Sequence, residues 1–344
     1  MKKIDGFHRG VNLGGWLSQC VHTQQHYDTF ITESDLRTIH EWGLDHVRIP
    51  VDYDLLETQE GAYRPEGFER LRTALGWCEK NHLNAIIDLH KTFGYSFDKG
   101  EGESGFFDNE ADQERFYRLW EQIAEHFGDR TEHVMFELLN EVTDKGYLSA
   151  WQRIYSTCIE RIRRIAPKVR ILVGGYWNNA VSAVKDLLPP QDENIIYNFH
   201  CYDPLLFTHQ GAHWVENMPL DFRFAFAQSM RAYAETTYKV LPQMGHQEFT
   251  DEVEAEKILG PDYFRAIFAE AVATAKERNV PLYCGEYGVI DLAEHADCLA
   301  WYKAIHEVFE ENGIARAAWS YRGMNFGIAD AAWDAERDQL IALM

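Results

Sequence analysis

The sequence predicts a (β/α)8 barrel, because short apolar segments alternate with longer amphipathic ones along the whole chain. The short segments, such as AIIDL and HVMFELL, are apolar almost throughout, which is typical of parallel strands buried on both faces. The longer segments, such as FERLRTALGWCEKN, have the apolar spacing of amphipathic helices. This alternation favours a closed barrel over an open sheet, and 344 residues are enough to form it as a single domain, residues 1–344.

The expected strands, in chain order, are Arg9–Leu13, His46–Pro50, Asn84–His90, His133–Asn140, Arg170–Gly174, Ile195–His200, Pro281–Glu286 and Ala315–Ser320. Between the sixth and seventh strands the chain is longer than one loop and one helix require. We expect the helix before the seventh strand at Asp262–Arg278, so residues 203–260 form an inserted helical subdomain. It should contain at least one helical piece, at Asp221–Val240, and a polar stretch at Glu248–Lys257. Because it follows the carboxyl end of a strand, it should lie over the catalytic face.

The composition excludes several classes of partner. The formal charge is −22, from 55 acidic and 33 basic side chains, and such a surface repels nucleic acids and anionic membranes. A neutral polysaccharide is unaffected by this field. No segment reaches the roughly 18 apolar residues of a membrane span. The six cysteines show no paired spacing, which predicts free thiols. As the sequence stands, without a signal peptide, we expect a cytoplasmic monomer; a trimmed signal would instead indicate secretion.

Polar residues end the predicted strands, where a barrel enzyme carries its catalytic groups. They are Arg48, His90, Asn140, Glu141, His200, Tyr202, Glu286 and Trp319. Taken alone, Arg48 fits an ordinary ion pair and His90 fits a core histidine. Carboxylates that follow apolar runs, however, are rarely buried without a partner or a task. The convergence of all these residues on one rim therefore predicts an active site.

Glu141 and Glu286, on facing strands, are suited to glycoside hydrolysis. That reaction needs one carboxylic acid to protonate the leaving oxygen and one carboxylate to attack the anomeric carbon, so their environments must separate their pKa values. Arg48 and Tyr202 are candidates to hold Glu286 ionised. His200 is a candidate neighbour of Glu141. A barrel that only binds carbohydrate would need neither glutamate.

The order Arg, His, Asn-Glu, His-x-Tyr, Glu, Trp, together with VNLGGWL, HVRIPVDY, FELLNEV and LYCGEYGVI, resembles glycoside hydrolase family 5 from end to end. The resemblance implies a retaining endo-β-1,4-glucanase with no cofactor and no metal. It assigns Glu141 as acid/base and Glu286 as nucleophile. It further implies that Asn140 binds the sugar 2-hydroxyl, that His90 contacts the sugar in the −1 subsite and that Trp319 forms its floor.

The substrate stays open at this level. The family often has a second histidine after the one on strand three, where this sequence has Lys91, and the next loop also differs. A mixed-linkage β-1,3-1,4-glucanase, an exo-β-1,3-glucanase and a β-mannanase use the same residues with different loops. We expect a β-glucan polysaccharide or oligosaccharide as the substrate. Trp214, in the insertion, is either a stacking platform for an outer sugar or an anchor for the inserted helices.

Two other patterns do not support a competing function. Residues 100–105 satisfy GxGxxG, but they begin well after the strand, and their glutamates would repel a dinucleotide pyrophosphate. His209 and His213 have HxxxH spacing, yet Gln210 and Gly211 between them argue against a zinc-binding helix. The sequence contains no GxSxG elbow for a serine hydrolase.

Overall fold

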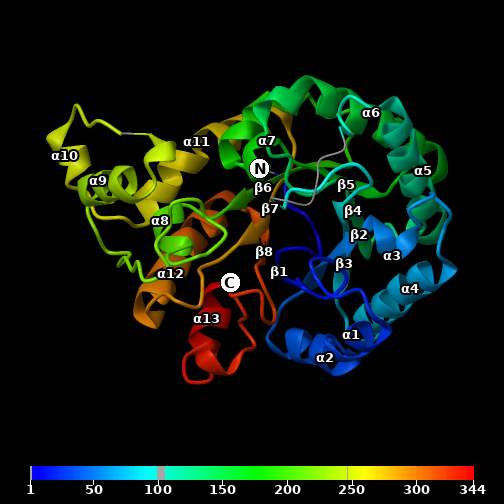
Figure 1. Ribbon diagram of the computed structural model, residues 1–344, viewed down its shortest axis with the longest axis horizontal. Coiled ribbons are helices and arrows are strands. Elements are labelled where there is room, and N and C mark those ends of the chain that lie inside the picture. Colours follow the sequence, from blue (N-terminus) through cyan, green and yellow to red (C-terminus); the bar gives the residue numbers. More distant parts are fainter. Residues whose placement is uncertain (1, 99–104, 246) are drawn as a thin grey trace.

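The computed structural model describes residues 2–98, 105–245 and 247–344. Its strands form a closed parallel barrel in the order β1 to β8, with β8 pairing back onto β1 (Figure 1). The predicted fold class is confirmed. The strands are β1 Arg9–Asn12, β2 His46–Asp52, β3 Asn84–Lys91, β4 Val134–Glu137, β5 Arg170–Val173, β6 Ile195–Cys201, β7 Leu282–Tyr287 and β8 Ala315–Ala318.

Helices surround the barrel (Figure 1). They are α1 Gln24–Thr29, α2 Glu33–Glu41, α3 Tyr53–Leu56, α4 Pro65–Lys80, α5 Glu110–Phe127, α6 Leu148–Ile165, α7 Tyr176–Asn179, α11 Pro261–Arg278, α12 His295–Asn312 and α13 Arg337–Leu343, with 3-10 turns at Lys145–Tyr147, Val181–Asp186 and Ala331–Trp333. Helix α5 shows why these segments fold as they do. The Asn109 side chain caps its first turn by accepting from the Ala111 amide. Phe116, Trp120 and Phe127 recur on one face and are fully buried, each contributing about 1.5–3 kcal/mol.

The alternation of side chains along each strand separates two environments. On β3, Ala85, Ile87 and Leu89 pack against the outer helices, while Ile86 belongs to a separate cluster inside the barrel. Asp88 and His90 follow Ile86 at the same period, so they point into the barrel nearer its carboxyl end. The barrel interior is therefore apolar toward the amino ends of the strands, here called the bottom. It is polar toward their carboxyl ends, the top, where the candidate site residues lie.

Two strands end two or more residues earlier than predicted. β4 ends at Glu137 and β8 at Ala318, whereas the sequence suggested Asn140 and Ser320. Beyond β4 the chain stays attached through single backbone bonds, from the Leu138 amide to Leu172 and from the Asn140 amide to Leu89. The regular ladder ends there because the chain must turn to present Asn140 and the residue after it.

Residues 203–260 contain α8 Leu205–Thr208, α9 Met230–Val240, a 3-10 turn Pro242–Met244 and α10 Glu252–Ala255. The helix expected at Asp221–Val240 begins only at Met230, so the prediction was wrong for residues 221–229. The Ser229 side chain caps α9 by accepting from the Ala232 amide, and the Phe224 amide bonds to the Gln210 side chain instead of a helical carbonyl. In Figure 1, α9 and α10 lie at one side of the barrel, beside α11 and α12.

Three further expectations concern features other than the barrel. All six cysteines lie in described parts of the chain, and each is a free thiol there. No helix in the described ranges is long and apolar enough to cross a membrane. Residues 100–104 of the GxGxxG pattern lie outside the described residues.

Candidate active site

Glu286 lies near the end of β7, where it is only 4% exposed. Arg48 Nη1 lies 2.7 Å from its Oε1, and the Tyr202 hydroxyl donates to its Oε2 over 2.9 Å. A register shift at Phe199–His200 places His200 directly opposite Glu286 in the β6–β7 ladder. One guanidinium and one hydroxyl donor thus fix the two oxygens of this carboxyl group in place.

Glu141 follows β4 with a φ of 40°, in the left-handed region that few side chains other than glycine adopt. Burial raises the pKa of its carboxyl to about 6. Its Oε1 lies 2.8 Å from His200 Nδ1, and Asn178 Nδ2 donates to its Oε2 over 2.9 Å. Burial also lowers the pKa of His200 to about 4, so this histidine is neutral near pH 7. The surroundings of Glu141 therefore lack the direct guanidinium contact that Glu286 has.

The two glutamates face each other across His200. One oxygen of each carboxyl and one nitrogen of the imidazole all lie within 4.8 Å of one another. His200 Nδ1 is also 3.6 Å from Glu286 Oε2. Retaining glycosidases hold their two carboxyl groups about 5–5.5 Å apart, whereas inverting enzymes leave about 6.5–9.5 Å for a water molecule. The short approach of the oxygens fits the retaining arrangement.

Arg48 is completely buried and is the centre of a polar network at the top of the barrel. Its Nε and Nη2 bond to the two carboxylate oxygens of Glu137 at 2.7 and 2.8 Å. Nη1 donates to Asn12, and Nη2 donates to Asn140 and pairs with Asp88 at 3.0 Å. The bidentate contact fixes the plane of the guanidinium, which in turn fixes where its Nη1 meets the nucleophile candidate.

The sequence reasoning missed Glu137, Asp88 and Asn12. The sequence does indicate Glu137 and Asp88, because each is a charged residue in an otherwise apolar strand. Each also lies at a position whose side chain should point into the barrel. A carboxylate within a buried run needs a cationic partner, and Arg48 is the buried arginine beside them. The chain pattern did not show which arginine would be that partner.

His90 and Trp319 form one wall of the site. Their rings are parallel within 4° with centroids 5.9 Å apart. His90 Nδ1 lies 2.5 Å from Asp88, and burial lowers the pKa of the imidazole to about 4. Trp319 fits because position 14 is glycine, where a Cβ would lie 2.8 Å from the indole. The structure thus brings together all eight residues that the sequence placed at the strand ends.

Trp214 is more distant from the glutamates. Its side chain is 40% exposed and packs edge-on against His209, which packs in the same way against Tyr202. His209 is partly buried, and desolvation lowers its pKa to about 4. Within the described ranges, His209 and His213 belong to none of the groups whose donor atoms converge as metal ligands would. The HxxxH spacing therefore corresponds to aromatic packing at the edge of the site.

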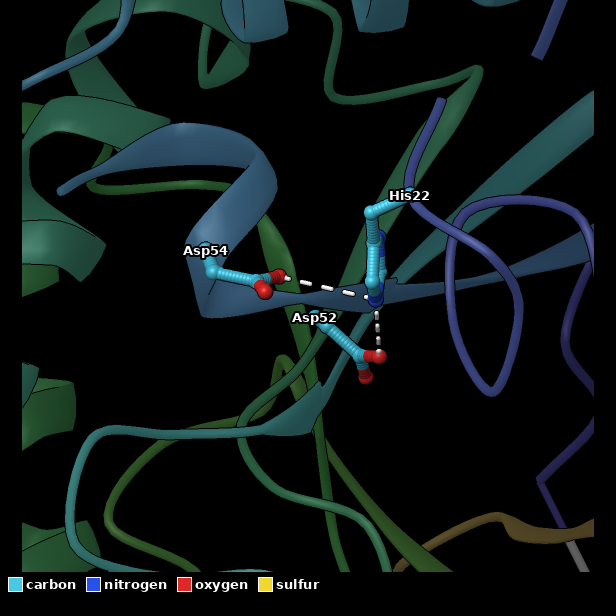
Figure 2. A group of neighbouring side chains, drawn as sticks. All are labelled: His22, Asp52 and Asp54. Carbon is cyan, nitrogen blue, oxygen red and sulfur yellow. Dashed lines mark ion pairs between the residues drawn. The ribbon is translucent and has the colours of Figure 1, made fainter. Parts of the chain in front are cut away.

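Besides the glutamate pair with His200, one other group of metal-ligating side chains converges in the described part of the chain (Figure 2). His22 Nε2 lies 3.3 Å from Asp52 and 3.8 Å from Asp54. The hydrogen bond to Asp52 raises the pKa of His22 to about 11, so a proton holds the imidazole between the two carboxylates. This charged group ties the segment after β1 to the end of β2.

Comparison with known proteins agrees with this geometry. The profile of Cellulase (glycosyl hydrolase family 5) matches residues 9–325. Cellodextrinase A of Ruminococcus flavefaciens is 44% identical over 92% of this chain and 86% of its own length. Endoglucanase C of Acetivibrio thermocellus is 34% identical over 94% of this chain and 93% of its own length. These matches define the class of the protein as glycoside hydrolase. Within that class the chain belongs to family 5, the cellulases.

Solved structures show the same fold. An endoglucanase superposes with a TM-score of 0.78 at 23% identity, over 98% of this chain and 97% of that one. Endoglucanase Cel5A of Thermotoga maritima in complex with cellobiose superposes with a TM-score of 0.76 at 24% identity, over 99% and 98% of the two chains. These superpositions confirm the (β/α)8 barrel fold.

Proposed function

We propose that the protein is a retaining endo-β-1,4-glucanase in which Glu286 is the nucleophile and Glu141 the acid/base. The observation that carries this proposal is the close approach of two carboxylates in unlike surroundings. Oxygens of the two groups lie within 4.8 Å, Arg48 contacts only Glu286 among them, and burial raises the pKa of Glu141 to about 6. The unlike surroundings suit Glu286 to act as the nucleophile and Glu141 to act as the acid.

The reaction would proceed in two steps. In the first, a Glu286 oxygen bonds to the anomeric carbon while the glycosidic C–O bond breaks and Glu141 gives its proton to the leaving oxygen. In the second, Glu141, now ionised, takes a proton from water. The water oxygen bonds to the anomeric carbon, and the ester bond to Glu286 breaks. Glu141 ends protonated and Glu286 ionised, as both began.

Two features of the site suit a pyranose ring. Asn140 uses its Oδ1 to accept from Arg48, while its buried Nδ2 finds no hydrogen-bond partner among the described residues. Such a donor is costly to leave unmatched, so it is available to a sugar hydroxyl. Trp319 and His90 present flat faces beside it. We infer that these three residues hold the sugar whose bond is cleaved.

The roles of the glutamates are tested by azide rescue. Glu141→Ala should be slow on poor leaving groups, remain partly active on activated aryl β-cellobiosides, and form a β-glycosyl azide by attack on the covalent intermediate. Glu286→Ala should form no β-glycosyl azide, and Glu286→Gln should not turn over. If azide instead rescues Glu286→Ala to the β anomer, the roles are exchanged. If both variants hydrolyse like the wild type, the barrel does not use these glutamates.

A substrate panel tests the linkage and the mode of attack. We expect hydrolysis of carboxymethylcellulose with a rapid loss of viscosity relative to new reducing ends, the signature of internal cleavage. The 44% identity to a cellodextrinase favours one second candidate, an enzyme restricted to soluble cello-oligomers. That candidate predicts activity on cellopentaose with little loss of viscosity. Preference for barley β-glucan, laminarin or mannan would assign the mixed-linkage, β-1,3 or mannan specificity instead.

A further inference from the structure

The turn after β5 has an unusual backbone. Trp177, Asn178 and Asn179 have φ values of 51°, 56° and 55°, so three consecutive residues other than glycine adopt the left-handed conformation. Each such residue costs about 1–2 kcal/mol relative to the right-handed form. Conformations of this kind persist only where surrounding contacts hold them, and they cluster at functional sites.

One contact holds this turn against the segment after β4, and another holds it against the end of β5. The Asn178 amide donates to the Val142 carbonyl over 3.0 Å, next to Glu141 in the chain. The Asn179 side chain occupies the space above Gly174, where a Cβ would lie 2.2 Å from its Oδ1. The turn is therefore locked to the segment that carries Glu141.

The strained turn aims two amides at the acid/base candidate and its neighbour. Asn178 Nδ2 donates to Glu141 Oε2 over 2.9 Å. Asn179 Nδ2 lies 3.4 Å from His200 Nε2, while His200 Nδ1 lies 2.8 Å from the other oxygen of Glu141. Both carboxylate oxygens are thus held, one directly and the other through His200.

We propose that Asn178 is a positioning residue, which holds the Glu141 carboxyl in place and favours its ionised form for the second step. This inference rests on the acid/base role proposed above for Glu141. An amide N–H donor stabilises a carboxylate more than the neutral acid. Burial raises the pKa of Glu141, and the hydrogen bond from Asn178 is the largest effect that opposes the rise. Without it, Glu141 would take up its proton more readily and orient less well.

The kinetic consequence has a definite sign. The first step needs protonated Glu141, so kcat/KM falls as pH rises through its pKa. Loss of the Asn178 amide raises that pKa and moves this basic limb to higher pH. The second step needs ionised Glu141, so kcat on an activated substrate, limited by hydrolysis of the intermediate, falls at acidic pH. A purely structural defect would lower both parameters at every pH without moving either limb.

The experiment compares Asn178→Ala with Asn178→Gly. Both remove the amide, but glycine adopts the left-handed backbone without strain, whereas alanine does not. Asn279→Ala is the matched control, because Asn279 is an exposed left-handed asparagine that caps α11 before β7, at the opposite end of the barrel. The kcat/KM of each protein is measured from pH 4 to 9 on a β-cellobioside with a poor leaving group, because only such a group depends on protonation by Glu141.

We expect both Asn178 variants to move the basic limb upward by about half a unit to one unit, equivalent to about three- to tenfold in the ionisation constant. Asn279→Ala should leave the limb in place. The proposal would be overturned if both Asn178 variants were active and the basic limb of kcat/KM stayed at the wild-type pH. It would also be overturned if the limb moved in Asn178→Ala but not in Asn178→Gly. Failure of the acid/base assignment would show differently, as Glu141→Ala retaining full activity on poor leaving groups.

Discussion

Replacement of Arg48 by alanine should be the most damaging single change near the site that leaves both glutamates intact. The guanidinium is fully buried and pairs with Glu137, Glu286 and Asp88 at 2.7, 2.7 and 3.0 Å. Its removal leaves buried carboxylates without their cation. Breaking a buried pair in this way costs about 3–5 kcal/mol of unfolding free energy. For a chain of 344 residues this corresponds to a melting temperature lower by about 4–7 °C.

The loss of Arg48 should also lower kcat, independently of its effect on stability. Glu286 loses a charge-assisted hydrogen bond worth about 1.5–3 kcal/mol, and if that bond acts mainly in the transition state, kcat falls by about 10- to 150-fold. KM should change little, because Arg48 lies behind Glu286 and Asn140 and does not reach distant sugars. Arg48→Lys restores the charge but not the bidentate contact with Glu137, so it should recover only part of the loss.

The assay measures kcat, KM and thermal unfolding on the same preparations at a temperature where every variant is folded. Arg316→Ala is a matched control, since Arg316 is equally buried but bonds to Glu310 and to the carbonyl of Met344. It should lower the melting temperature without lowering kcat. An Arg48→Ala enzyme with normal kcat and only a raised KM would contradict this prediction, because it would show that Arg48 does not support Glu286 during catalysis.

Two other predictions address the rim of the barrel. Trp214→Ala should lose activity on long glucans and cello-oligomers but keep its activity on short activated substrates. Its melting temperature should change little, because Trp214 is already 40% exposed. Equal losses on all substrates, together with a clear fall in melting temperature, would instead identify Trp214 as an anchor for the inserted helices. The pKa of His22 is raised from 6.5 to about 11, so its pairing with Asp52 stabilises the fold fully below pH 6.5 and progressively less as pH rises toward about 11. The difference in melting temperature between wild type and His22→Gln should therefore be larger at pH 6 than at pH 10, and an unchanged difference would show that the pair does not titrate in that range.

The barrel and the eight strand-end residues of its site could be predicted from the sequence alone. Apolar runs such as AIIDL are typical of strands buried on both faces, and their alternation with amphipathic helices favours a parallel sheet covered by helices. Once the strands are parallel, their carboxyl ends meet at one edge, so His90 and Glu286 must converge whatever the details of packing. These conclusions depend only on the spacing of apolar residues and on the order of the predicted strands and helices. Both can be obtained from one sequence.

The tertiary structure decided how the converged residues divide their roles. Arg48 meets Glu137 and Glu286 from positions far away in the chain, and alternation along a strand gives the face of a side chain but not its partner. Asn178 gave no sequence signal, because its left-handed turn contains no glycine and is held by contacts with the distant Val142 and Glu141 and with Gly174. Burial, which sets the pKa of Glu141, is likewise a property of the closed barrel. Local patterns therefore fix the edge at which chemistry occurs, whereas partners, strain and desolvation arise only when distant segments pack.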